Sequence, residues 1–435
     1  MTLTLTFAAC QNDDAIQVDI DQELRVLLAE TSPNASMANY IFPTQYQFLP
    51  QDPNNLLNEQ KIALGKLLFH ETAFAQENLF QNTAGTYSCA TCHHVKAGFS
   101  SGNVQGIGEG GIGFGERGEG RLPDELLNPI VLDVQPNRSP TVLNSVYHEV
   151  MLWNGQFGST GLNANTQDRW FVDTPLEVNF LGFQGMESQA IAAIEVHRLK
   201  FDEELVTELG YKTLFDLAFP EIDETERYND TIAGLAMAAF ERTIVASEAP
   251  FQRWLKGQRS AMSMDEKEGA LLFFGKAGCV SCHNGPSLAN MEFSALGFND
   301  FDEEEVFHLP AVNNAVKGRA SFTGEDGDLY KFKVPQLYNL ADNPFYGHGA
   351  SFRSIRAVLD YKNAAIAENP IVDPSYLDSR FQPLELSEEE LDALEAFLTY
   401  ALYDPNLDRY VPEEVLSGSC FPNADPLSQL QLGCN

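Results

Sequence analysis

Two copies of the pattern Cys-x-x-Cys-His carry the strongest chemical signal in this chain. The residues are Cys89, Cys92 and His93 in the first copy and Cys279, Cys282 and His283 in the second. Two thiols at this spacing can form thioethers with the two vinyl groups of one porphyrin, and the histidine that follows then lies under the iron as proximal ligand. A redox dithiol or half of a zinc site is the alternative, but no second cysteine pair lies near either copy. The two patterns therefore predict two covalently bound haem c groups.

A repeated helical segment precedes each pattern and would position it. Apolar residues recur at helical spacing over residues 59–69 and again over 266–274, which predicts an amphipathic helix leading into each haem-binding turn. Further helices are expected over 188–208, over 231–248, and from Ser387 to 403, where Ser387 and Glu390 form a capping-box pattern. Because alternating strand patterns are scarce, the expected fold is mainly α, with two cytochrome-c-like haem domains and long loops.

The expected division of the chain follows this repeat. Residues 36–250 are assigned to an N-terminal haem domain and 251–435 to a C-terminal one, with the boundary at Ala249-Pro250, between the two patterns. The glycine-rich segment from Gly98 to Gly120 is expected to be a loop and not a phosphate cradle, since no Gly-Lys-Ser/Thr follows it.

The charge of the chain limits its partners. The 435 residues contain 27 Lys and Arg against 62 Asp and Glu, a formal net charge of −35. Such an acidic chain excludes nucleic acid as a partner. It would attract a basic redox protein; the alternative is that the acidity only keeps the protein soluble, as in many secreted proteins, and reflects no particular partner. No run of about 18 apolar residues, the length needed to span a bilayer, is present.

The two ends of the chain carry the remaining cysteines. A short apolar run from Leu3 to Ala9 ends directly before Cys10, which resembles the end of a bacterial lipoprotein signal with Cys10 as the lipid-bearing thiol. Residues 1–35 are accordingly expected to be a signal remnant and tether; an incidental cysteine in a disordered leader is the alternative. In an oxidising compartment Cys420 and Cys434 could pair and clip the C-terminal tail.

Further motifs in a fixed order extend the comparison to a known family. They are Leu64-Gly65-Lys66-Leu67-Leu68-Phe69, Ser139-Pro140-Thr141-Val142-Leu143-Asn144, Trp153-Asn154-Gly155 and Lys333-Val334-Pro335-Gln336-Leu337-Tyr338-Asn339-Leu340. With these motifs and both haem patterns, the chain resembles the bacterial dihaem cytochrome c peroxidase and MauG family over residues 50–403. The resemblance implies a peroxide-reacting N-terminal haem and an electron-transferring C-terminal haem.

The same resemblance implies the setting of the reaction. It implies hydrogen peroxide as substrate, a small cytochrome or cupredoxin as electron donor, and export to the periplasm, since bacterial haem c is attached outside the cytoplasm. It also allows a homodimer, and a calcium ion between the domains with Asn137 as a ligand.

Cleavage of peroxide needs a distal group that moves a proton, and Glu187 is the candidate. It follows Phe183-Gln184-Gly185-Met186 and matches the family's Gly-x-Glu region, while Gln184 would assist by hydrogen bonding. An acid that only stabilises a helix N-terminus is the alternative. Trp153 matches the tryptophan that the family places between the haems, where it would relay electrons; core packing is the alternative.

Two features differ from part of the family. No histidine lies between His94 and His148, so the N-terminal haem is expected to be open without reductive activation, and His148 is interpreted as an ordinary polar helix residue. The alignment places Lys362, with Tyr361 beside it, where the sixth ligand of the C-terminal haem is methionine or tyrosine. Either Tyr361 or Lys362 would bind that iron. The alternative is that both are exposed helix residues and that the iron is bound by His308 or His348 or is five-coordinate.

Three functions remain open from the sequence. The first is a dihaem peroxidase that uses Glu187 at the His93 haem and receives electrons through the His283 haem and Trp153. The second is a MauG-like enzyme that oxidises a protein or small molecule, and the third is an electron carrier without peroxide chemistry.

Overall fold

The computed structural model describes residues 11–434 and is mainly α-helical, as expected. The α-helices are α1 (Gln11–Glu30), α2 (Glu59–His70), α3 (Cys89–Cys92), α4 (Gly185–Val196), α5 (Glu203–Glu208), α6 (Lys212–Ala218), α7 (Asp230–Glu241), α8 (Pro250–Leu255), α9 (Met264–Phe274), α10 (Ala320–Thr323), α11 (Ile355–Ala364), α12 (Glu388–Ala396) and α13 (Pro426–Leu432). Two antiparallel pairs of two-residue strands, β1 (Gly111–Ile112) with β2 (Leu122–Pro123) and β3 (Phe293–Ser294) with β4 (Phe332–Lys333), complete the regular structure. Long loops and 3-10 turns join these elements.

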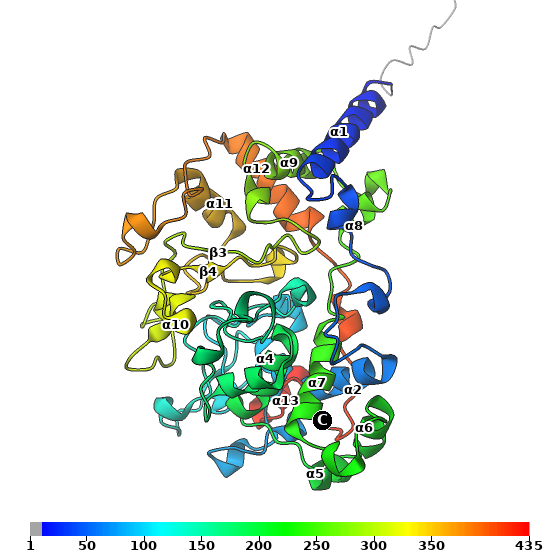
Figure 1. Cartoon of the computed structure of the whole chain (residues 1–435), viewed down its shortest axis with the longest axis vertical. Coiled ribbons are helices and arrows are strands. Elements are labelled where there is room, and N and C mark those ends of the chain that lie inside the picture. Colours follow the sequence, from blue (N-terminus) through cyan, green and yellow to red (C-terminus); the bar gives the residue numbers. More distant parts are fainter. Residues whose placement is uncertain (1–10, 435) are drawn as a thin grey trace, which may run out of the picture.

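The sequence repeat is a structural repeat. Helix α2 crosses α7, and α9 crosses α12, each at a glycine that lets the two backbones approach closely. A Cβ on Gly65 would lie 1.9 Å from the Ala236 carbonyl oxygen, and one on Gly269 would lie 1.9 Å from that of Ala393. Figure 1 shows α2 and α7 in the lower half of the view and α9 and α12 in the upper half. Each haem-binding pattern therefore follows the first helix of one close-packed helix pair.

Side-chain caps fix where these helices begin. The Asn58 Oδ1 atom accepts a hydrogen bond from the Lys61 backbone N–H (2.7 Å) at the start of α2. Helix α9 opens with a Ser263–Glu266 capping box, and α12 opens with the predicted Ser387–Glu390 box. The predicted helix from Ser387 to 403 is confirmed up to residue 401, because a π-helical turn (Phe397–Ala401) continues α12.

Two predicted helices are shorter than expected. The predicted helix over 188–208 is broken between α4 and α5, where Arg198 adopts a φ of +56° and the Asp202 carboxylate caps the new helix at Leu205 N (2.8 Å). The predicted helix over 231–248 ends at Glu241. Beyond Glu241 the backbone forms hydrogen bonds with Asn144 instead of continuing the helix. The Asn144 N–H donates to the Ile244 carbonyl, and the Asn144 side chain accepts from Ala246 N.

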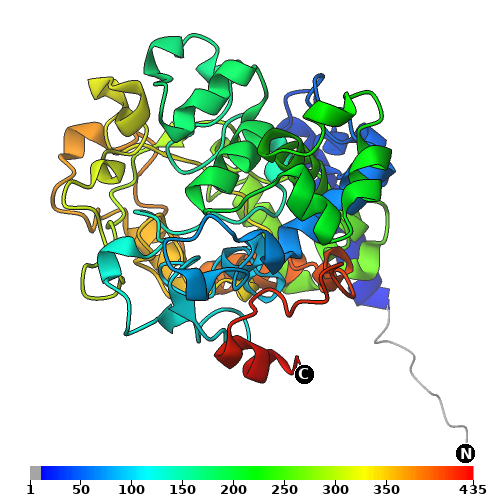
Figure 2. The ribbon, with the colours of Figure 1, turned by 90° about the horizontal axis from the view of Figure 1, so that it is seen from below.

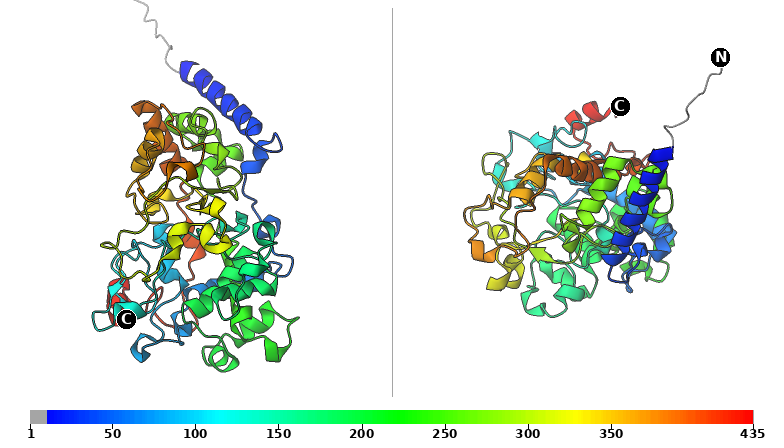
Figure 3. Two further views of the ribbon diagram at one scale, coloured as in Figure 1. Left: turned by 60° about the vertical axis from the view of Figure 1, so that its left-hand side comes forward. Right: turned by 90° about the horizontal axis from the view of Figure 1, so that it is seen from above.

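The end of α1 packs on the upper half of the molecule (Figure 3). Ile20, Leu24 and Leu28 are buried, and the Asp21 carboxylate lies 2.8 Å from both Lys267 Nζ and Trp254 Nε1. Residues 20–30 therefore differ from the expected tether, because an apolar stripe and a buried acid fix them to the core. Cys10 lies outside the described residues, and within residues 11–434 no helix is long and apolar enough to cross a membrane.

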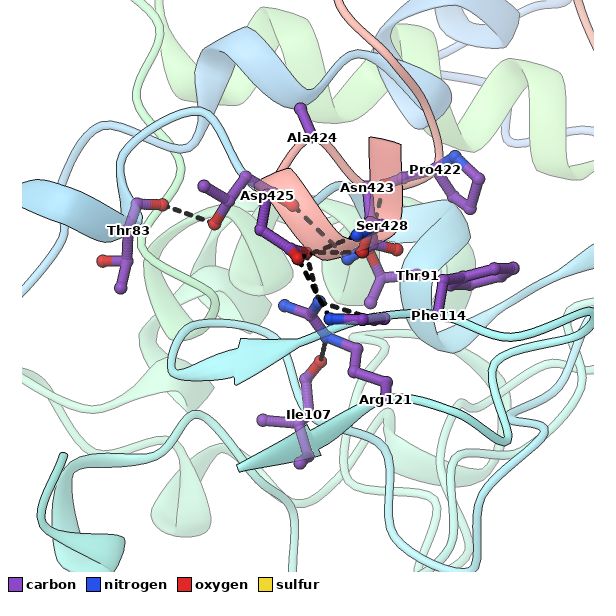
Figure 4. A network of polar contacts seen from close by, with 12 residues as sticks. Thr83, Thr91, Ile107, Phe114, Arg121, Pro422, Asn423, Ala424, Asp425 and Ser428 are labelled. Carbon is purple, nitrogen blue, oxygen red and sulfur yellow. Dashed lines mark hydrogen bonds and ion pairs between the residues drawn. The ribbon is translucent and has the colours of Figure 1, made fainter. Parts of the chain in front are cut away.

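The C-terminal segment returns to the N-terminal half. Cys420 and Cys434 form the expected disulfide. The Pro422 carbonyl accepts hydrogen bonds from the hydroxyls of Ser88 (3.0 Å) and Thr91 (3.1 Å) in the first haem-binding segment. Figure 2 shows this red segment alongside the blue part of the chain, and Figure 4 shows the buried ion pair of Arg121 with Asp425 (3.2 Å) that holds it.

The hydrophobic core joins the two halves. One cluster of buried residues includes Phe69 and Phe240 from the first helix pair and Phe273 and Phe397 from the second. A second cluster lies within the first half, around α2, α4, α6 and α7. Helix α8 begins at Pro250, where the domain boundary was placed, but the division of the chain into two domains stays a prediction.

Candidate dihaem site

The first Cys-x-x-Cys-His pattern forms one tight turn. Cys89 to Cys92 make helix α3, and Ser88 and Thr91 cap it reciprocally. The Nδ1 atom of His93 lies 3.3 Å from the Phe99 carbonyl oxygen. Because a carbonyl only accepts, Nδ1 carries the hydrogen and Nε2 keeps the free lone pair that an iron ligand needs. Burial lowers the pKa of His93 to about 4, so the ring is neutral at pH 7.

The second pattern has the same local design. Cys279–Ser281 form a 3-10 turn, and His283 Nδ1 lies 2.9 Å from the Leu288 carbonyl oxygen. Burial lowers the pKa of His283 to about 4 as well. In both patterns the backbone fixes the imidazole in the tautomer that presents Nε2 to a metal.

A cavity of about 300 Å³ opens beside the second pattern and suits a porphyrin. Its walls are mostly apolar, as a haem face requires, and they come from α9, α11, α12 and the loops around β3 and β4. The lining includes Cys279, Cys282, His283, Phe273, Leu296, Leu359, Leu394 and Leu398. The thiols and the imidazole at one end, with a deep apolar wall beyond them, fit covalent haem.

Glu187 lies in a buried polar cluster near the first pattern. It occupies the first turn of α4, and Arg242 holds both of its carboxylate oxygens, with Nε–Oε1 at 2.7 Å and Nη2–Oε2 at 2.6 Å. The same guanidinium donates to Gln184 Oε1 (3.0 Å), and Asn55 Nδ2 lies 3.4 Å from Glu187 Oε1. Glu187 and Gln184 are therefore brought together by Arg242, a residue that the sequence analysis did not single out.

Glu241 is a second buried acid in this cluster that the sequence analysis missed. Its side chain is 5% exposed, and its Oε2 atom has no hydrogen-bond partner among the described residues. Burial, and then the charge of Glu187, raise the pKa of Glu241 to about 8. One helical turn before it on the same face of α7, Met237 Sδ lies 3.9 Å from Cys89 Sγ. Glu241 therefore keeps its proton at pH 7. It lies on the face of α7 that contacts the first haem-binding turn.

Trp153 lies at the wall of the second cavity. Its indole Nε1–H donates to the Arg138 carbonyl (2.8 Å), and its own carbonyl accepts from Lys333 N in β4 (2.8 Å). The ring meets His348 edge to face, with centroids 6.3 Å apart. These contacts hold one aromatic ring between the loop at Arg138 and the wall of the second cavity.

Only one of the two candidates for the sixth ligand lines the cavity. The Tyr361 hydroxyl donates to the Leu296 carbonyl and its ring packs on Phe298 and Phe381, and Tyr361 is not itself among the residues that line the cavity. Lys362 lines the cavity with His283, and no hydrogen bond or ion pair occupies its ammonium group in the part of the chain that the structure describes. The geometry thus favours Lys362 over Tyr361.

His148 differs from its expected surroundings, and His348 lies in the cavity wall. His148 is not a polar helix residue: burial lowers its pKa, and its Nδ1 lies 2.8 Å from Lys333 Nζ. His348 lines the cavity, stacks on Phe332 with centroids 3.5 Å apart, and bonds Asp300 Oδ1 through Nε2 (3.1 Å). Neither environment was visible from the sequence, because each partner is distant along the chain.

Two matching helix pairs, each with a haem-binding turn after its first helix, define a c-type cytochrome fold that holds two haems. A family model described as di-haem cytochrome c peroxidase matches residues 59–260. The methylamine utilization protein MauG of Methylorubrum extorquens is 30% identical over 357 residues, covering 82% of each chain. The cytochrome c551 peroxidase of Nitrosomonas europaea is 26% identical, covering 69% of this chain and 72% of its own. This chain belongs to the di-haem cytochrome c peroxidase and MauG family of oxidoreductases.

Solved structures share the fold. A MauG-like protein associated with microbial copper homeostasis superposes with a TM-score of 0.59 at 22% identity, covering 85% of this chain and 96% of its own. The diheme peroxidase BthA from Burkholderia thailandensis gives 0.51 at 16% identity, covering 82% and 89%. At these identities the likeness describes the fold and not the reaction.

Proposed function

We propose that this protein is a dihaem c-type peroxidase that reduces hydrogen peroxide with electrons from a small redox protein. The buried cluster of Glu187, Gln184, Arg242 and Glu241 carries the proposal. A plain electron carrier has no use for Glu241, because a buried carboxyl without an ion-pair partner, placed beside a second buried acid, reduces stability. Haems at His93 and His283 would supply the iron that exchanges electrons with peroxide and with the donor.

The residues of the cluster have distinct roles in this proposal. Glu187, with its charge balanced by Arg242, accepts a proton from peroxide, and Gln184 orients the substrate by hydrogen bonding. Glu241 is neutral at pH 7 and can return a proton to the oxygen that leaves as water. Two carboxyls in different charge states thus provide a base and an acid at one site.

The electron path and the setting complete the proposal. His283 and Lys362 would hold the second haem, which would supply the point of electron entry, and Trp153 would carry electrons between the two halves. The net charge of −35 favours a basic donor such as a small cytochrome or cupredoxin. We further propose a periplasmic location with a lipid anchor at Cys10, a calcium ion near Asn137, and a homodimer.

A MauG-like oxidase is the second candidate, and the surroundings of Lys362 favour it. No methionine lines the second cavity; the Met291 thioether instead accepts a hydrogen bond from Glu149 N (3.3 Å). An amine ligand lowers the reduction potential of haem relative to methionine, which favours a site that holds oxidising equivalents over one that passes electrons quickly.

Turnover measurements separate the two candidates. A peroxidase oxidises a reduced small cytochrome at a steady rate while peroxide is consumed. A MauG-like oxidase turns such a donor over slowly and keeps its peroxide-oxidised spectrum for a long time when no donor is present. Absence of any reaction with peroxide would contradict both.

The ligand proposal has its own test. In the Lys362→Ala variant the second haem should lose its low-spin optical and EPR signature, and Lys362→Met should restore a low-spin haem with a higher potential. Tyr361→Phe is the matched control and should leave the spectrum unchanged. Loss of the signature in Tyr361→Phe, with none in Lys362→Ala, would refute the assignment.

A further inference from the structure

Two buried cations near Trp153 have no acidic partner. Lys333 is 8% exposed, and its ammonium group contacts only the uncharged ring of His148 among the described side chains. Arg138 is 2% exposed and donates to Ser100 Oγ (2.6 Å) and to the Ser101 carbonyl (2.8 Å), both neutral. Neither cation forms an ion pair with any carboxylate within residues 20–434.

Three other buried cations have close carboxylate partners, whereas the buried Arg319 donates to the neutral oxygens of Asn154, Gly155 and Asn163 and lies outside the cavity lining. Arg121 pairs with Asp425, Arg242 with Glu187, and Lys267 with Asp21, at 2.6 to 3.2 Å. A buried charge without a counter-ion is costly, and burial lowers the pKa of Lys333 to about 7 and that of Arg138 to about 9. Unlike Arg319, both Lys333 and Arg138 line a cavity, which leaves room for an anion from outside the chain to complete the site.

The location of the two cations identifies the class of that anion. Both line the cavity beside Cys279, Cys282 and His283. The His148 ring also lines it, and its Nε2 atom is buried without a hydrogen-bond partner in the described chain. A carboxylate inside this cavity would meet an ammonium, a guanidinium and a free imidazole nitrogen.

The same two residues hold Trp153 by its polar groups. The Arg138 carbonyl accepts from the indole N–H, and the Lys333 N–H donates to the Trp153 carbonyl, both at 2.8 Å. Because Trp153, Arg138 and Lys333 line one cavity, an anion bound by the two side chains would lie in the cavity that Trp153 borders.

We propose that Lys333 and Arg138 bind the propionate carboxylates of the haem attached at Cys279 and Cys282, with the propionate edge of that haem facing Trp153. The proposal rests on the dihaem assignment and not on the peroxidase reaction. The pairing gives both cations a counter-ion, and it removes the repulsion that two uncompensated positive charges would exert on a positive charge passing through Trp153.

The reduction potential of the second haem tests the proposal in the holoprotein. Lys333→Met removes a positive charge beside the propionates, so the ferric form gains relative stability and the potential should fall. The propionate bending band in the resonance Raman spectrum should shift as well. Lys333→Arg keeps the charge and should restore most of the potential, and the His93 haem should change less than the His283 haem.

A variant outside the cavity supplies the matched control. Lys331 lies two residues away and does not line the cavity; its side chain is 36% exposed and has only a 3.8 Å ion pair to Asp328, so Lys331→Met removes the same charge elsewhere. The proposal is overturned if Lys333→Met, with both haems attached, leaves the potential and the Raman band at their wild-type values, or if Lys331→Met shifts them equally. If Lys333→Met does not retain haem, the reduction potential and the Raman band are measured in Lys333→Gln, which keeps a polar head on the side chain. Shifts in both would support the proposal, and wild-type values would overturn it. If these shifts are observed but the protein has no peroxidase activity, the proposed function is contradicted and the propionate proposal is not.

Discussion

Replacing Glu241 by glutamine should stabilise the protein at neutral pH. The folded state holds the proton of Glu241 up to a pKa of about 8, whereas an unfolded glutamate releases it near 4.5. Between these values the folded state binds more protons than the unfolded state, so stability falls as pH rises, by about 1.4 kcal/mol per pH unit. The contribution of protonated Glu241 to the free energy of unfolding is fully present below pH 4.5 and is lost as the pH rises through 8. At pH 7 the accumulated loss of unfolding free energy is about 3 to 4 kcal/mol at most, and Glu241→Gln removes it.

Urea unfolding of the holoprotein from pH 4 to pH 9 measures this effect. The wild type and Glu241→Gln should have similar free energies of unfolding at pH 4, and the variant should become increasingly the more stable one up to pH 8. Glu268→Gln, at an exposed position on α9, is the control and should follow the wild type. Parallel curves for the wild type and Glu241→Gln over the whole range would refute a raised pKa at this site.

Two further predictions concern the fold. Gly269→Ala should cost about 3 kcal/mol of unfolding free energy, because the added Cβ would lie 1.9 Å from a carbonyl oxygen of α12. Gly327→Ala, where an added Cβ meets nothing within 4 Å, should cost less than about 1 kcal/mol, and equal losses for both would contradict the close helix crossing. Cys420→Ser opens a disulfide between residues 14 apart and should cost about 3 kcal/mol in non-reducing urea titrations. If reducing the disulfide of the wild type leaves its free energy of unfolding unchanged, the predicted stabilising role of the disulfide is wrong.

Much of the fold could be predicted because its signals are local. The helices before the two haem patterns, the Ser387 capping box and the Cys420–Cys434 disulfide all depend on residues close together in sequence. The break between α4 and α5 was missed because the apolar period continues across Arg198, whose left-handed backbone is set by the surrounding structure. The packing of α1 was missed for a similar reason, since Asp21 finds Lys267 and Trp254 only in three dimensions.

In the candidate site, too, residues within local motifs were recognised from the sequence, and contacts between distant residues were not. Glu187, Gln184 and Trp153 were found by their motifs, while the roles proposed for them remain predictions. Arg242 and Glu241 end a helix that looked like ordinary core, and only the packing of α4 on α7 brings them to Glu187. The choice between Tyr361 and Lys362 also needed coordinates, because adjacent residues of a helix face different surroundings.

The optical and EPR spectra of the ferric holoprotein, before and after one equivalent of hydrogen peroxide, test the central claim most directly. The wild type should show one high-spin haem whose spectrum changes on adding peroxide. Glu187→Gln should slow this change, and Glu195→Gln, at an exposed position on the same helix, should not. Two low-spin haems that do not respond to peroxide would contradict the peroxidase account and leave a dihaem electron carrier.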